Sequence, residues 1–159
     1  MILVLLGTQN KPFNRLLKAI SREIKNGNIK DKVIAQTGFT SYSGDDIQCF
    51  DYRPKEELLE LMNKANVVIT HGGVGTIIEC IDINKKIIVV PRLKKYKEHT
   101  NDHQLQITKE FAEKGYVLPL YNMKDLVKVL QDIKKFKTKK YESNSENFKN
   151  KIKDYINNI

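Results

Sequence analysis

The chain has little cysteine and no long apolar segment. Only Cys49 and Cys80 occur among its 159 residues, and their apolar surroundings predict buried thiols rather than a disulfide framework. No apolar run approaches the ~18 residues of a membrane span, and the run at residues 2–6 leads straight into a turn, so neither a transmembrane helix nor a secretory signal is predicted. We therefore expect a cytoplasmic, single-domain protein that is small for a complete two-substrate enzyme.

A glycine-rich turn between an apolar run and a helix pattern is the most informative stretch of the chain. Val67, Val68 and Ile69 are consecutive β-branched residues, which predicts a strand buried on both faces of a parallel sheet. The sequence H-G-G-V-G-T follows at residues 71–76. Glycines at this place let backbone N–H groups approach a ligand closely at a helix N-terminus. We therefore expect the turn to bind a phosphate or diphosphate.

Two familiar nucleotide-binding signatures are absent from this turn. It lacks the third glycine of G-x-G-x-x-G, and no G-K-[ST] follows it, so neither a dinucleotide fingerprint nor a P-loop is supported. Glu79 lies one helical turn after Thr76, where its carboxylate can accept hydrogen bonds from ribose hydroxyls, which indicates a nucleotide. The same Thr76-x-x-Glu79 spacing also fits a capping box, which involves no ligand.

Strand and helix patterns alternate along the chain. Predicted strands cover residues 2–6, 33–36, 47–50, 67–69, 87–90 and 116–118. Predicted helices begin near residues 12, 54, 76, 100 and 123, and Leu105, Phe111 and Ala112 are expected on the buried side of the fourth. This alternation predicts an α/β fold with an open, mostly parallel Rossmann-like sheet and helices on both faces over residues 1–135.

Ligands of such sheets bind at the carboxyl ends of the strands. The loops expected at that edge are residues 7–9, 37–38, 71–76 and the segment from residue 91 to residues 102–104. Asp102, His103 and Gln104 suit the hydroxyls of a sugar, although polar residues in the first turn of a helix are also explained by the helix dipole. His99 and His103 are four residues apart but have no third ligand at a sensible spacing, so no metal is predicted.

Positive charge is concentrated towards the end of the chain. The net charge is +9, and residues 134–159 hold eight lysines against three acidic residues. The sequence of residues 136–159 predicts a basic linker followed by an amphipathic helix. This helix either packs on its own domain or docks a partner. No basic stripe interleaved with aromatics occurs, so nucleic acid is not an expected partner.

Four short motifs occur in combination along the chain. They are L-L-G-T at residues 5–8, H-G-G-V-G-T-I-I-E at 71–79, I-I-V-V-P-R at 87–92 and E-H-T-N-D-H-Q-L-Q at 98–106. Together they resemble the donor-binding C-terminal half of GT-B glycosyltransferases of family 28, over residues 1 to about 118. The similarity is greatest to short, single-lobe members, above all the PssE-like subunits of exopolysaccharide and capsule synthesis.

The resemblance implies a catalytic, donor-binding subunit of a two-component inverting glycosyltransferase, with no metal or other cofactor. It would move galactose or N-acetylglucosamine from UDP to a lipid-linked acceptor. Glu79 would hold the ribose, and Asp102, His103 and Gln104 would face the donor sugar, with His103 and Glu79 as the catalytic candidates. The site residues implied in this way are Gly7, Thr8, His71, Gly72, Gly73, Gly75, Thr76, Glu79, Asp102, His103 and Gln104.

The resemblance also implies a second chain. Larger relatives carry an acceptor-binding lobe that this sequence does not include, so the general base and the acceptor site are expected on a membrane-associated, PssD-like partner. That partner would recruit the protein to the inner face of the membrane. The alternative is a non-catalytic UDP-sugar-binding module that stabilises or activates a partner transferase.

Overall fold

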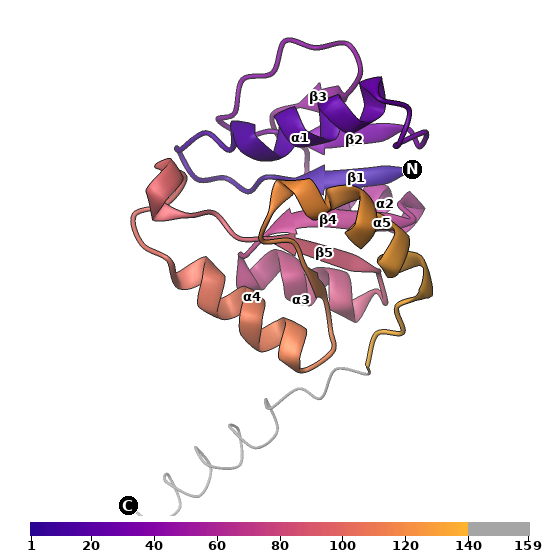
Figure 1. The fold of residues 1–159 in the computed structure, drawn as a ribbon, viewed down its shortest axis with the longest axis vertical. Coiled ribbons are helices and arrows are strands. Elements are labelled where there is room, and N and C mark those ends of the chain that lie inside the picture. Colours follow the sequence, from indigo (N-terminus) through magenta and orange to yellow (C-terminus); the bar gives the residue numbers. More distant parts are fainter. Residues whose placement is uncertain (140–159) are drawn as a thin grey trace, which may run out of the picture.

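Six short strands pair side by side in one sheet of the computed structural model, which describes residues 1–139 (Figure 1). They are β1 (Ile2–Leu5), β2 (Val33–Gln36), β3 (Gln48–Phe50), β4 (Val67–His71), β5 (Ile87–Val90) and β6 (Leu118–Pro119). Their order is β3-β2-β1-β4-β5-β6, and every pairing is parallel. This is the doubly wound order of Rossmann folds, which confirms the predicted fold class.

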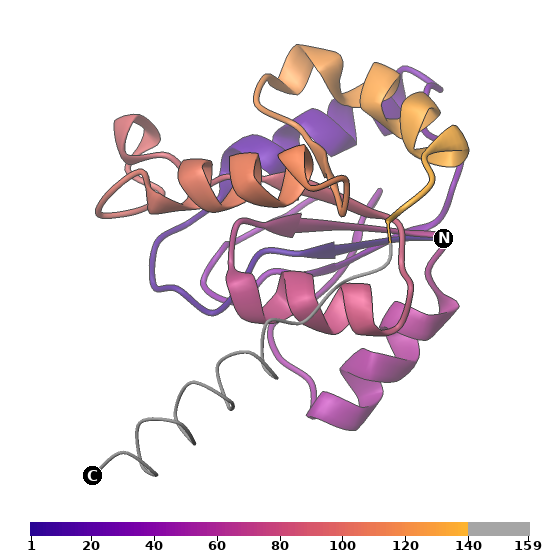
Figure 2. The same cartoon turned by 90° about the horizontal axis from the view of Figure 1, so that it is seen from below.

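Helices cover both faces of this sheet. The α-helices are α1 (Asn14–Lys25), α2 (Lys55–Lys64), α3 (Val74–Asp82), α4 (His103–Glu113) and α5 (Leu126–Lys135), with 3₁₀ turns η1 (Lys94–Tyr96) and η2 (Met123–Asp125). Figure 2 shows α1 and α5 on one side of the sheet and α2 and α3 on the other. The apolar residues of α4 join the cluster that α2 and α3 form.

The two hydrophobic clusters meet at the central strands. In β1, Leu3 and Leu5 belong to the cluster beneath α2 and α3, whereas Ile2 and Val4 belong to the cluster beneath α1 and α5. Because successive side chains of a strand point to opposite faces, a strand covered on both sides reads as a continuous apolar run. This is why residues 2–6 show no alternation of apolar and polar residues.

Two predicted burials are wrong. Cys49 is exposed because β3 is the outermost strand and pairs only with β2, whereas Cys80 is buried as predicted and burial raises the pKa of its thiol to about 12. Leu105 is 39% exposed. Helix α4 begins at His103, later than expected, and buries Gln104 and Thr108 instead, so the buried face passes beside Leu105.

The end of the described chain returns to the body of the domain. Helix α5 ends at Lys135, Phe136 packs against the cluster beneath α1 and α5, and the Lys139 N–H donates to the Gly115 carbonyl at 3.1 Å. The predicted C-terminal amphipathic helix falls on residues 140–159, which lie outside the described residues. Within residues 1–139, no helix is both long and apolar enough to cross a membrane.

Truncation of two leucines tests this assignment of the core. Leu17 of α1 is fully buried, whereas Leu105 of α4 is 39% exposed. We expect Leu17→Ala to lower the free energy of unfolding by about 2–5 kcal/mol, since it leaves a cavity, and Leu105→Ala to change it by only about 0.5 kcal/mol. Urea unfolding followed by circular dichroism measures both. Equal losses of unfolding free energy in the two variants would show that Leu105 is buried, as the sequence predicts.

Candidate functional site

The carboxyl edge of the sheet brings together the loops that the sequence predicts there. A Cβ atom added to Gly7 would lie 2.7 Å from the His71 ring, and one added to Gly38 would lie 2.7 Å from the Gly7 carbonyl oxygen. Gly7 and Gly38 also have positive φ angles, 79° and 53°, so glycine is required there for both reasons. Residues 7–8, 37–38 and 71–73 therefore form one surface.

The imidazole of His71 lies at the centre of this surface. A Cβ atom added to Gly73 would lie 2.3 Å from its Nε2 atom, so the ring sits between Gly7 and Gly73. Burial, with a smaller contribution from the positive charge of Arg92, lowers the pKa of His71 from 6.5 to about 4. The ring is therefore neutral at physiological pH.

Helix α3 presents backbone amides that no side chain caps. Gly73 is its N-cap residue, and α3 begins at Val74. Within the described residues, the N–H groups of Val74, Gly75 and Thr76 have no hydrogen-bond partner, while the Ile77 N–H donates to the Gly73 carbonyl. The amides at a helix N-terminus carry partial positive charge and attract anions, so this turn has the properties of an anion site.

The capping-box alternative is wrong. Thr76 lies inside the first turn of α3 rather than at its cap, and no side chain makes a capping hydrogen bond to this helix. The Glu79 carboxylate instead pairs with the ammonium group of Lys55 at 3.3 Å, and its side chain is 43% exposed. Glu79 is therefore accessible, one turn into the helix.

Gly75 differs from the other glycines of the turn. A Cβ atom added to Gly72 would lie 2.8 Å from Cβ and the carbonyl oxygen of Gln104, so packing explains that glycine. A Cβ atom at Gly75 would meet nothing within 4 Å, and its φ is not positive. Neither packing nor backbone strain requires glycine at position 75, and the space that its side chain would occupy is open.

At the start of α4, Gln104 packs against the turn, whereas Asp102 and His103 are exposed. Gln104 is buried, and its Oε1 atom accepts hydrogen bonds from the N–H groups of Gly72 at 3.1 Å and Arg92 at 3.0 Å. Asp102 is exposed and accepts from the Lys94 N–H at 2.9 Å. His103 is exposed, with Nδ1 3.3 Å from Oε1 of Gln106. Asp102 and His103 thus remain accessible to a ligand.

A buried polar network that the sequence did not predict supports this edge. Arg92 is 1% exposed, and its guanidinium donates to the carbonyl oxygens of Leu6 and Lys11 at 2.6 Å each and of Glu98 at 3.2 Å. Glu98 is 3% exposed and accepts two 2.9 Å hydrogen bonds from Arg15. The network ties the loop after β1 to the loop after β5.

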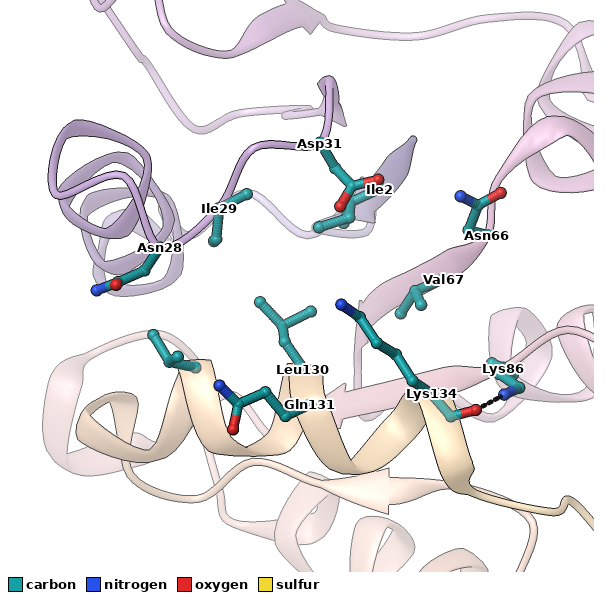
Figure 3. A pocket seen from close by; sticks show the side chains of 11 residues that line it. Ile2, Asn28, Ile29, Asp31, Asn66, Val67, Lys86, Leu130, Gln131 and Lys134 are labelled. Carbon is teal, nitrogen blue, oxygen red and sulfur yellow. Dashed lines mark hydrogen bonds between the residues drawn. The ribbon is translucent and has the colours of Figure 1, made fainter.

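The opposite edge of the sheet holds a separate cavity of about 670 Å³ (Figure 3). Its apolar walls include Ile2, Ile29 and Leu130, and Lys86 donates there to the Lys134 carbonyl. None of the predicted site residues lines it. The cavity lies at the amino ends of the strands, whereas ligands of doubly wound sheets bind at the carboxyl ends.

The fold and the edge together define the class of protein. The strand order reverses between β1 and β4. Gly7 lies two residues after β1, and His71 is the last residue of β4. The candidate site therefore lies at the topological switch point of a doubly wound α/β domain.

The family follows from comparison with known proteins. The model of the glycosyltransferase family 28 C-terminal domain matches residues 1–159, and the chain belongs to that family. Among solved structures, the NMR solution structure of ALG13 superposes with a TM-score of 0.59 at 21% identity and covers 89% of each chain. Acinetobacter baumannii MurG superposes with a TM-score of 0.57 at 14% identity, covering 82% of this chain and 40% of that chain.

Curated relatives are longer than the aligned regions. The UDP-N-acetylglucosamine transferase subunit ALG13 of Candida albicans is 27% identical over 89 residues, which cover 56% of this chain and 29% of that protein. The human protein of that name is 30% identical over 105 residues, 66% of this chain and 8% of that protein. A third relative is 40% identical over 77 residues, which cover 46% of this chain and 20% of that protein. It is the UDP-N-acetylglucosamine--N-acetylmuramyl-(pentapeptide) pyrophosphoryl-undecaprenol N-acetylglucosamine transferase of Streptococcus mutans. The chain therefore spans less than a third of these relatives.

The low pKa of His71 predicts that the fold weakens in mild acid. Because folding lowers this pKa from 6.5 to about 4, the unfolded chain takes up the proton first, and stability is lost as the pH falls through that interval. We expect the contribution of His71 to make the protein about 2 kcal/mol less stable at pH 5 than at pH 7. Urea unfolding at both pH values measures the loss.

A His71→Gln variant is the control, since it removes this titration and leaves every other ionisable group in place. The difference in unfolding free energy between pH 7 and pH 5 should be smaller in the variant by the same amount. An identical pH dependence in both proteins would show that the buried imidazole does not contribute.

Proposed function

We propose that this chain is the catalytic, donor-binding subunit of a two-component inverting glycosyltransferase that uses a UDP-sugar. The observation that carries the proposal is the row of unpaired amides at Val74, Gly75 and Thr76, with open space above Gly75. The diphosphate lies on these amides, and the ribose hydroxyls donate to Glu79. Asp102 and His103 face the donor sugar, and Gly7 and Thr8 line the other side of the cleft.

The chemistry follows from where charge develops. As the glycosidic bond breaks, negative charge builds on the departing UDP, and amides and a helix dipole already aimed at the diphosphate stabilise it without reorganising. The neutral His71 beneath the turn adds no charge of its own. The general base that takes the acceptor proton belongs to the partner in this proposal, as does the site for a lipid-linked acceptor.

N-acetylglucosamine is the donor sugar that we propose first. Support comes from the Candida albicans, human and Streptococcus mutans relatives, each of which is named as an N-acetylglucosamine transferase or a subunit of one. Galactose is the other donor considered, on the PssE-like sequence motifs alone. A thermal-shift panel of UDP-N-acetylglucosamine, UDP-galactose, UDP-glucose and UDP distinguishes them, because the preferred donor stabilises the folded state most at equal concentration.

We infer that the partner is a membrane-associated, acceptor-binding subunit of the PssD-like kind. The carboxyl edge leaves His103, Asp102 and Thr8 exposed, so a second lobe can close the cleft there. The partner would bring this chain to the inner face of the membrane.

The Gly75→Ala variant distinguishes an effect on donor binding from an effect on folding. Gly75→Ala places a methyl group in the open space beside one of the free amides, and alanine favours a helix over glycine by about 1 kcal/mol. We expect an unchanged or higher melting temperature together with UDP affinity weakened about tenfold, the equivalent of one hydrogen bond. Thermal unfolding and isothermal titration measure the two effects.

Asp82→Ala at the far end of α3 is the matched control, since it changes helix propensity in an exposed position without approaching the turn. Its UDP affinity should equal that of the wild type. If Gly75→Ala binds UDP as tightly as the wild type, the diphosphate does not lie on these amides. A wild-type protein that binds no UDP would contradict the donor proposal itself.

His103 distinguishes a catalytic subunit from a passive binding module. In the complex purified with its partner, we expect His103→Ala to lower turnover by about 100-fold, in the range for loss of one positioned catalytic group, while the complex stays intact. Sugar transfer from labelled UDP-N-acetylglucosamine and size-exclusion chromatography measure turnover and assembly. Lys109→Ala, an exposed change later in α4, is the control. Unchanged turnover in His103→Ala would favour the non-catalytic module.

A further inference from the structure

The strands β4 and β5 separate at the carboxyl edge, and their separation leaves two buried amides to be satisfied. The last paired residues of the two strands are His71 and Val90. Beyond this pair, the Gly72 and Arg92 N–H groups no longer bond to a neighbouring strand. An unpaired buried amide is costly, so both groups need another acceptor.

A single side-chain atom accepts both hydrogen bonds. Oε1 of Gln104 lies 3.1 Å from the Gly72 nitrogen and 3.0 Å from the Arg92 nitrogen, and a carbonyl oxygen has two lone pairs for this purpose. Gln104 is itself buried, which restricts the movement of its side chain. The first turn of α4 is thereby joined to the ends of two strands.

We propose that Gln104 is a positioning residue for the diphosphate site, on the assumption that the proposed function is right. Because Oε1 accepts the Gly72 N–H, this amide is not available to an anion. The same bond fixes the position at which the chain enters α3. The site then consists of the amides of Val74, Gly75 and Thr76, whose directions follow from that entry. Through these two bonds Gln104 affects the binding of UDP even when no donor sugar is attached.

Packing supports the same assignment. Because a Cβ atom at Gly72 would lie 2.8 Å from Cβ and the carbonyl oxygen of Gln104, the turn and α4 are in direct contact with no room between them. Arg92 extends the connection to the end of β1 through its hydrogen bond to the Leu6 carbonyl. The oxygen of Gln104 thus holds the turn against a rigid part of the fold, which preorganises the amides before a ligand arrives.

The test compares two ligands in two variants of the full chain. Gln104→Met keeps the length of the side chain and removes the acceptor, whereas Gln104→Glu keeps an acceptor oxygen at the same place. UDP binding uses the turn amides, and uridine binding does not. We expect Gln104→Met to lower the ratio of UDP affinity to uridine affinity about tenfold, and Gln104→Glu to stay within about threefold of the wild type.

Thr108→Val is the matched control for a general loss of stability. It removes the hydrogen bond to the Gln104 backbone carbonyl inside α4 without touching the turn, so the affinity ratio should not change. A wild-type ratio in Gln104→Met would overturn the proposal. A loss confined to UDP-N-acetylglucosamine, with UDP unaffected, would also overturn it and make Gln104 a sugar contact.

Amide hydrogen exchange in the wild-type chain gives an answer even if Gln104→Met does not fold. The Gly72 amide should exchange slowly with or without UDP, while the amides of Gly75 and Thr76 should exchange rapidly and slow down when UDP binds. Fast exchange at Gly72 that UDP suppresses would contradict the role of Gln104 and leave the diphosphate proposal standing. A wild-type protein that does not bind UDP would instead count against the proposed function.

Discussion

The parallel pairing of β1 with β4 is the constraint on which the rest of the structure depends. The pair ends with Leu5 beside Thr70, whose hydroxyl donates to the Leu5 carbonyl at 3.2 Å. The chain then turns towards α1 after one strand and towards α3 after the other, and these helices lie on opposite faces of the sheet (Figure 2). Two connections that leave in opposite directions open a crevice between them. Gly7, two residues after β1, and His71, the last residue of β4, lie at this crevice because both are at the carboxyl ends of these strands.

Opening the crevice exposes backbone groups that strands would otherwise pair, and buried side chains replace those partners. The Arg92 guanidinium satisfies carbonyl oxygens of Leu6 and Lys11, and Glu98 joins Arg15 of α1 to the loop after β5. Burying such charges costs free energy unless they are well hydrogen-bonded. Within the described residues, the Nε atom of Arg92 has no partner, but its other nitrogens do, and Phe13 packs on the guanidinium. A single lobe therefore keeps a defined crevice of its own.

Local patterns predicted the sheet and the edge at which the candidate site residues meet, but not the contacts between distant segments. Apolar runs such as 87–90 indicated buried strands, and the rule that ligands lie at carboxyl ends brought residues 7, 71–76 and 102–104 to one edge. The pairing of Arg15 with Glu98 joins residues 83 positions apart, and no local spacing indicates it. The predicted burial of Leu105 is wrong for a related reason. The hydrogen bonds of Gln104 to Gly72 and Arg92 turn the Gln104 side of α4 inwards. The sequence located Gln104 near the turn, yet only coordinates identify what its oxygen binds.

If the proposed function is right, the electrostatics of this edge explain why dipoles rather than charges would stabilise the departing diphosphate. A positively charged histidine beneath the turn would bind an anion before and after reaction alike, whereas burial and Arg92 keep His71 neutral. The Glu79 carboxylate would repel a diphosphate, but its pairing with Lys55 at 3.3 Å offsets that repulsion. Both side chains of this pair are exposed, so the pair contributes little to stability. In the proposed complex, ribose hydroxyls would replace Lys55 as the partner of Glu79. The net charge of +9 attracts anions from a distance. In the proposed reaction, the fixed amides would stabilise charge as it develops, since they need no reorganisation when it appears.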